Sequence, residues 1–266
     1  NSSLEKYKFI GVGRDDGEKK GEFCAIYFDT TLYEILDYST FWLSETPDLV
    51  SVGWDASLER ICTYGLFAST YSGEKFWVFN THFDHIGKVA RKKSSELILE
   101  KIKKINKESL PVILMGDFNS IPKSESVNIL EQGMIDGLQI SSKHLQGPRG
   151  TFNGFDLSNP INKRIDYIFI KNFQVLSYRH IDDRFENNNH ISDHLPVMAV
   201  LERLHRKEWL FILYVPLKVI RKYSWGSVYV KTSFDFISNM VAKWGWNKFC
   251  GGKHFVIFLK ESKPKL

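Results

Sequence analysis

Short apolar runs bounded by turn residues recur along residues 1–202 and predict β-strands. The run Leu-Pro-Val-Ile-Leu-Met at 110–115 is apolar throughout, which is typical of a strand buried on both faces of a sheet. Further strands are expected at 4–10, 22–28, 32–38, 41–47, 60–67, 75–80, 164–170, 173–180 and 197–201.

Turn residues between these runs predict how the strands connect. Residues 29–31 are expected to join 22–28 and 32–38 in a hairpin, and residues 71–74 to form a second hairpin turn. An amphipathic helix is expected at 94–106, after a basic and solvated stretch at 88–93. A short helix is expected at 125–131 and a long loop at 141–162. Strands joined partly by hairpins and partly by helices indicate mixed sheets.

Length and charge divide the chain into two unequal parts. Its 266 residues, of which 43% are hydrophobic, suffice for one large α/β or sandwich domain, or for two small ones. Residues 1–202 contain 23 Lys and Arg against 28 Asp and Glu, whereas residues 203–266 contain 13 against 3. The basic C-terminal part is either a contact for nucleic acid or anionic lipid, or a solvated surface.

The three cysteines and the chain ends carry little further information. Cys24, Cys62 and Cys250 are far apart and have no metal-ligand spacing, so we expect buried or idle thiols. No leader peptide is visible, and the apolar run at 209–220 is too short to span a bilayer. We expect a soluble monomer and leave the compartment open between cytoplasmic and secreted.

The strand predicted at 110–115 is followed by Gly-Asp-Phe-Asn, with Asp117 and Asn119 two residues apart. In an extended backbone such positions share one face, so both side chains should point into one small volume. A carboxylate binds a cation or takes a proton from water, and an amide donates to an anionic oxygen. The pair suits phosphoester chemistry, although Asp and Asn also occupy ordinary turns after strands.

Three further polar motifs lie where predicted strands begin or end, which is where α/β folds place their ligands. They are Asn80-Thr-His82, Arg164-Ile-Asp166-Tyr and Ser192-Asp193-His194. A single histidine at a strand end is more often structural, but this ordered set resembles the endonuclease/exonuclease/phosphatase superfamily of magnesium-dependent phosphodiesterases and phosphatases. The resemblance covers residues 7–202, and the segments 11–17 and 41–47 look like those of a bacterial subgroup.

The resemblance implies the fold and the domain division. The superfamily fold is a four-layer α/β sandwich in which two mixed β-sheets pack face to face with helices outside. We therefore expect a domain of this type over residues 1–202 and a basic, Trp-rich extension of unknown fold over 203–266. The extension is either a small packed appendage, which we favour, or a stacking surface for single-stranded nucleic acid.

Residue roles follow from the resemblance by position. Asp117 would orient or deprotonate the attacking water, and Asn119 would hold that water or the scissile phosphate. His82 would contact the phosphate or assist the leaving group. His194 would donate to a non-bridging phosphate oxygen, and Asp166 would hydrogen-bond to its ring and fix the tautomer.

Metal and substrate contacts complete this expected site. Asp193 and Asp117 would bind the divalent cation, Mg²⁺ or Mn²⁺, which neutralises charge on the phosphoryl oxygens. Arg14, in the glycine-rich loop at 11–17, is expected to bind substrate together with Asn119 and His194. The resemblance thus predicts a metal-dependent phosphodiesterase, nuclease or phosphatase. Its substrate would be a nucleic acid, a nucleotide, or a phosphorylated lipid or sugar.

One departure from the superfamily pattern favours a competing hypothesis. The superfamily's first-strand Asn and its principal metal-binding Glu have no match, because Glu22, Glu45 and Asp16 come too late in the chain. This chain would then bind metal weakly and turn over slowly, as a catalytically impaired module that binds phosphate or nucleic acid. The alternating segment 227–234 is a candidate strand that could fill the vacated position in the sheet.

Overall fold

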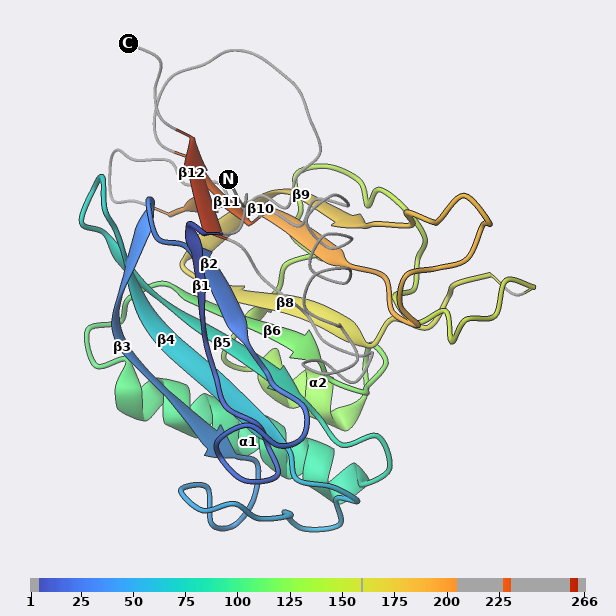
Figure 1. The fold of residues 1–266 in the computed structure, drawn as a ribbon, viewed down its shortest axis with the longest axis horizontal. Helices are drawn as coiled ribbons and strands as arrows, with labels where there is room; N and C mark the ends of the chain where they lie inside the picture. Colours follow the sequence, from blue (N-terminus) through green and yellow to red (C-terminus); the bar gives the residue numbers. More distant parts are fainter. Residues whose placement is uncertain (1–4, 159, 205–226, 231–258, 263–266) are drawn as a thin grey trace.

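The computed structural model describes residues 5–158, 160–204, 227–230 and 259–262 (Figure 1). The strands are β1 (Tyr7–Ile10), β2 (Ile26–Asp29), β3 (Tyr33–Trp42), β4 (Ile61–Ser69), β5 (Lys75–His82), β6 (Val112–Asp117), β7 (Ile135–Asp136), β8 (Asp166–Lys171), β9 (Phe173–His180), β10 (Val197–Arg203), β11 (Ser227–Val230) and β12 (Leu259–Ser262). The helices are α1 (Lys88–Ile105) and α2 (Glu125–Leu130). No helix in this described part has the length and apolar character needed to span a bilayer.

The main sheet has the strand order β3-β4-β5-β6-β8-β7. β5 and β6 run parallel and are connected through α1, whereas the other neighbouring pairs are antiparallel. This confirms the predicted α/β class with a mixed sheet. The parallel pair brings the carboxyl ends of β5 and β6 to one edge, where ligands bind in folds of this kind.

The apolar run in β6 serves two cores because both faces of the main sheet are covered. Val112 and Leu114 pack with Ile98 of α1 on one face. Ile113 and Met115 pack on the other face against β1, β2, β9 and β10 (Figure 1). Neighbouring residues point to opposite faces of a strand, so burial on both faces requires an unbroken apolar run.

The second layer consists, in the described part of the chain, of antiparallel pairs. β1 pairs with β2, β9 with β10, and β11 with β12. β11 lies beside β10, and β12 lies beside β2 (Figure 1). A strand is therefore present within the predicted segment 227–234, and the rest of the expected extension, with Cys250, lies outside the described residues.

Three local predictions were wrong. The strands expected at 32–38 and 41–47 are a single strand, β3, which ends at Trp42. β2 does not form a hairpin with β3: β2 pairs with β1, while β3 pairs with β4 in the main sheet. The turn at 29–31, closed by Asp29 Oδ1 accepting from the Thr31 amide, carries the chain from one layer to the other. The helix predicted at 94–106 begins at Lys88, so the basic stretch forms its first turns.

A buried ion pair ties β7 to the segment before β8. The Arg164 guanidinium donates to both carboxylate oxygens of Asp136, and both residues are buried. We expect Asp136→Asn to lower the free energy of unfolding by about 3 kcal/mol, because it leaves a buried guanidinium uncompensated. Urea unfolding measures this loss, and Asp48→Asn, in the exposed pair with Lys101, should leave the free energy of unfolding nearly unchanged. Equal losses in both variants would contradict the prediction.

His180, at the end of β9, makes stability depend on pH. The ring is buried, and its Nδ1 lies 2.8 Å from the Pro148 carbonyl oxygen. Burial lowers the pKa of His180 to about 4. Between about pH 6.5 and pH 4, the unfolded chain therefore binds a proton at this histidine and the folded chain does not. The free energy of unfolding is highest above about pH 6.5 and falls by up to about 3 kcal/mol as the pH drops to 4.

This pH dependence can be isolated with two variants. We expect His180→Gln to flatten the decline in unfolding free energy between pH 6.5 and pH 4, measured by urea unfolding. His144→Gln, which removes an exposed histidine, should leave the decline unchanged. An equally steep decline without His180 would assign the effect to other groups.

Candidate active site

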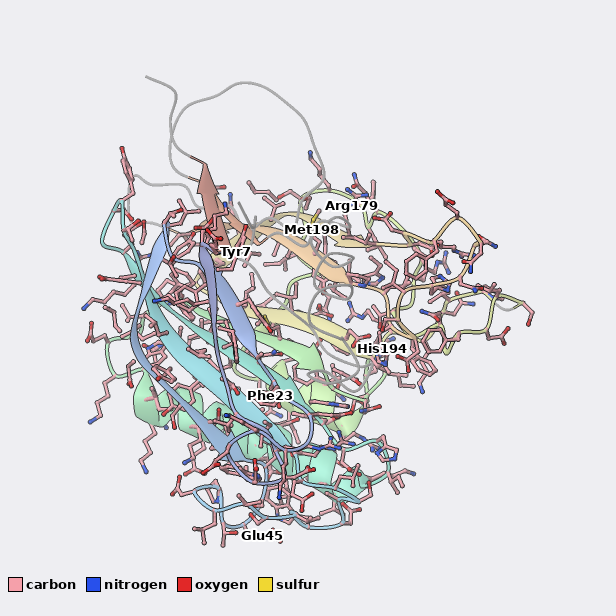
Figure 2. All side chains as sticks on the ribbon, in the orientation of Figure 1. Tyr7, Phe23, Glu45, Arg179, His194 and Met198 are labelled. Atoms are coloured by element: carbon pink, nitrogen blue, oxygen red, sulfur yellow. The ribbon has the colours of Figure 1, made fainter. Side chains whose placement is uncertain are left out.

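The polar residues at three strand ends lie side by side across the main sheet. His82 in β5 is the register partner of Asp117 in β6, and Asp117 is the partner of Asp166 in β8. Gly116 allows β6 to approach β5 closely, because a Cβ there would lie 1.8 Å from the Thr81 carbonyl oxygen. Figure 2 shows His194 where β6 ends and β8 begins.

Asp117 lies between two histidines. Its Oδ2 is 3.3 Å from Nε2 of His82 and 3.9 Å from Nε2 of His194. Burial favours the neutral acid, but the two imidazoles and the Asn119 amide outweigh it and lower the pKa of Asp117. The carboxylate is therefore charged, and the two rings flank it.

A turn, rather than an extended strand, brings Asn119 to Asp117. β6 ends at Asp117, and Asn119 has a φ of 45°, a left-handed conformation that Asn tolerates better than most residues. The Asn119 amide nitrogen lies 2.8 Å from Asp117 Oδ1, and its side-chain Nδ2 donates to the Phe83 carbonyl oxygen at 2.9 Å. The expected proximity is present, but the i, i+2 argument from an extended backbone was wrong.

Asp166 and His194 form a buried pair. Nδ1 of His194 lies 3.0 Å from each carboxylate oxygen of Asp166. Burial opposes the imidazolium, but the charge of Asp166 outweighs it and raises the pKa of His194. The hydroxyl of Thr151, which the sequence analysis did not single out, accepts hydrogen bonds from the Ile165 and Asp166 amides and so fixes the start of β8.

Arg14 reaches this region through Glu22. The Arg14 guanidinium lies 2.6 Å from Glu22 Oε2, and the same oxygen is 3.4 Å from Nδ1 of His82. On sequence alone, Glu22 was considered only as a metal ligand and was excluded from that role. One sequence signal could have indicated another role for Glu22. It lies eight residues after Arg14, just beyond the glycine-rich loop.

Asp117, Asp166 and His194 are the described residues that could hold a metal ion together, with ligand atoms within 4.8 Å of one another. Both oxygens of Asp166 are used in the pair with His194, so Asp117 offers the hard oxygen that Mg²⁺ and Mn²⁺ favour. This donor set fits a divalent cation. The structure does not bring Asp193 into the set; its carbonyl oxygen accepts from the Asn153 amide at 2.8 Å.

The layered α/β fold places carboxylates and histidines together at the strand ends of its main sheet. Residues 9–194 match the profile of the Endonuclease/Exonuclease/phosphatase family, and the chain belongs to this family. Its members are phosphoesterases and nucleases, and they generally use a divalent metal ion. The predicted family is thereby confirmed.

Bacterial structures are similar to this chain over most of its length. An endonuclease/exonuclease/phosphatase family protein of Bacteroides thetaiotaomicron is 41% identical, with a TM-score of 0.69, over 73% of this chain and 74% of its own. Mannosyl-6-phosphatase Bt3783 of the same species is 40% identical, with a TM-score of 0.71, over 74% and 77%. The uncharacterized protein L388 of Acanthamoeba polyphaga mimivirus is 32% identical, and the match spans 60% of this chain and 63% of that protein.

Proposed function

We propose that this protein is a divalent-metal-dependent hydrolase of phosphoester bonds. The observation that carries the proposal is the position of Asp117, a buried carboxylate flanked by the imidazoles of His82 and His194 at the end of β6. An ionised carboxylate between two rings can accept a proton from water while the rings face an anionic substrate. The catalytic domain in this proposal is residues 1–202, and β11 and β12, from the basic part that follows it, lie against its second layer.

Asp117 is the residue proposed to orient and deprotonate the attacking water. Its Oδ1 accepts from the Asn119 amide, which holds the carboxylate in place. Asn119 would position the water or the phosphate, His82 would face the phosphate or the leaving group, and Arg14 would attract the anionic substrate. His82 and Asn119 both contact Asp117, as general base catalysis requires, whereas Arg14 contacts Glu22.

His194 is the proposed donor to a non-bridging phosphate oxygen. Asp166 accepts from Nδ1, which leaves the proton on Nε2 directed toward Asp117 and the substrate. The resulting imidazolium balances the negative charge that builds up on the phosphoryl group. Asp166 thus acts on the reaction through the orientation and charge of His194.

Asp117 would supply the carboxylate that holds the cation, Mg²⁺ or Mn²⁺, in the group that it forms with Asp166 and His194. When bound, the ion supplies a Lewis acid that neutralises charge on the phosphoryl oxygens. The residues of this chain supply the general base, the donor to the phosphate and the amide that positions water.

A phosphomonoester of a sugar is the substrate we favour. The support is the 40% identity to mannosyl-6-phosphatase Bt3783 over most of both chains. Nucleic acids, nucleotides and phosphorylated lipids are the competing classes.

The test compares 4-nitrophenyl phosphate, bis(4-nitrophenyl) phosphate and mannose 6-phosphate with Mg²⁺ or Mn²⁺. We expect the monoesters to be hydrolysed faster than the diester, activity to disappear in EDTA, and the added metal to restore it. Activity that survives EDTA or Asp117→Ala would contradict the metal mechanism. Tight binding of phosphate without hydrolysis would instead favour the impaired, phosphate-binding module.

A further inference from the structure

Phe152 lies between His194 and a lysine outside the proposed catalytic set. Its backbone pairs with Lys163 on one side and with His194 on the other, and both pairings are antiparallel. Residues directly opposite each other on neighbouring extended segments point to the same face. The side chains of His194, Phe152 and Lys163 therefore form a row on one face of a ladder of three segments.

The side chains of this row contact one another. The Phe152 ring packs edge-on against the His194 imidazole, with ring centroids 5.1 Å apart. Nζ of Lys163 lies 4.9 Å from the centroid of the same Phe152 ring, which is within cation–π distance. His194 is buried, Phe152 is half-buried and Lys163 is exposed, so the row runs from the proposed active site to the solvent.

Backbone hydrogen bonds hold the row in place. The amides of Thr151 and Phe152 donate to the Lys163 carbonyl oxygen at 2.9 and 3.0 Å. The Leu195 amide donates to the Thr151 carbonyl oxygen at 2.6 Å. The segments also approach closely, because a Cβ at Gly150 would lie 2.5 Å from the Lys163 amide nitrogen. Lys163 is therefore fixed relative to the proposed active site.

The Lys163 ammonium can bind an anion at a defined distance from His194. Within the residues that the structure describes, it contacts the Phe152 ring and no carboxylate pairs with it. An ammonium has three N–H donors, and a ring contact leaves donors for an anionic oxygen. Neighbouring segments of a ladder lie about 4.8 Å apart, so the backbones of Lys163 and His194 are about 10 Å apart.

We infer that Lys163 is a specificity-determining residue that binds a second phosphate of the substrate, and that the preferred substrates are hexose bisphosphates. One phosphate would lie beside His194, the sugar would pack on the Phe152 ring, and the other phosphate would accept from the Lys163 ammonium. Lysine binds phosphate as a point charge, whereas a carboxylate is matched better by the planar fork of arginine. This inference rests on the proposed phosphoester hydrolase and narrows its favoured substrate class.

The first experiment compares kcat/KM for fructose 1,6-bisphosphate and fructose 6-phosphate, in the full chain with Mn²⁺. We expect the bisphosphate to be preferred about tenfold by wild type, because a charge-assisted hydrogen bond contributes about this factor. A preference no larger than the statistical doubling from two hydrolysable phosphates would overturn the inference.

Variants of Lys163 assign this preference to its charge. Lys163→Gln removes the charge and should reduce the preference to the statistical doubling, whereas Lys163→Arg keeps the charge and should retain most of it. Lys171→Gln, which changes an exposed lysine at the other end of β8, is the matched control and should keep the wild-type preference. A wild-type preference in Lys163→Gln, or an equal loss in Lys171→Gln, would overturn the inference.

The second experiment measures binding without hydrolysis, so it separates this inference from the proposed function. Calorimetric titration of wild type in EDTA should give a Kd for fructose 1,6-bisphosphate about tenfold below that for fructose 6-phosphate. Lys163→Gln should remove this difference. If wild type hydrolyses neither ester, the proposed function fails, but a difference in Kd that depends on Lys163 would still support the inferred role. Equal Kd values in wild type, no measurable binding of the bisphosphate, or a difference that persists in Lys163→Gln would overturn it.

Discussion

Asp117→Asn is expected to lower kcat on any substrate of this protein by about a thousandfold. The amide of Asn cannot accept the proton of the attacking water, and general base catalysis of this kind contributes about 10²- to 10⁴-fold. The change also removes the negative charge that faces His82 and His194 at 3.3 and 3.9 Å. Initial rates at saturating substrate and Mn²⁺ measure the loss.

Asp117→Asn should keep the native fold. Asn is isosteric with Asp, and the side-chain oxygen can still accept from the Asn119 amide, so the thermal midpoint should stay close to that of wild type. Asp37→Asn, an exposed carboxylate on β3, is the matched variant and should keep full activity. A kcat within tenfold of wild type in Asp117→Asn would exclude Asp117 as the base.

Asp166→Asn is expected to lower kcat by about 10²- to 10⁴-fold while leaving the fold intact. Asp166 accepts from Nδ1 of His194 through both oxygens at 3.0 Å, whereas an asparagine can present its NH₂ group there and favour the wrong tautomer. In serine proteases, the equivalent loss of the carboxylate behind the catalytic imidazole costs about 10⁴ in kcat. The control is a double variant with His194→Ala, which should be no worse than His194→Ala alone.

The pH dependence of the same variant gives a second readout. Asp166 raises the pKa of His194 above its ordinary value of about 6.5, so activity that needs the imidazolium persists above that pH and declines only at a higher one. Asp166→Asn removes the charge, and the alkaline decline of kcat should move to lower pH. An alkaline limb at the same pH in wild type and Asp166→Asn would show that His194 is not the titrating group.

Local sequence signals predicted β5, β6 and β8 because these strands are buried on both faces. β5 and β6 are apolar at consecutive positions, and such runs have few structural alternatives when turn residues bound them. The polar motifs at the strand ends could be located in the sequence because the apolar runs have clear ends. His82, Asp117 and Asp166 each end or begin an apolar run, so their place at strand ends was predicted. The pairing of β6 with β5 and with β8, which brings them to one edge, came from the structure.

The sequence did not predict which strands pair in the second layer. The turn at 29–31 resembles a hairpin turn, yet β2 pairs with β1, with Tyr7 as the partner of Asp29. A turn signal is local, whereas the choice of partner depends on which apolar faces lie close together after collapse. The left-handed φ of Asn119 was missed similarly, because the predicted strand was extended past Asp117.

The sequence by itself determined the α/β class, the family and the strand-end residues, because each depends on the order and spacing of residues along the chain. Only the tertiary structure decided which of those residues meet. Glu22 and His82 are distant in sequence, and their contact, like that of Asp166 with His194, exists only because separate strands and loops converge at one edge of the main sheet. Such contacts depend on the packing of two layers against each other, which sequence periodicity alone does not encode.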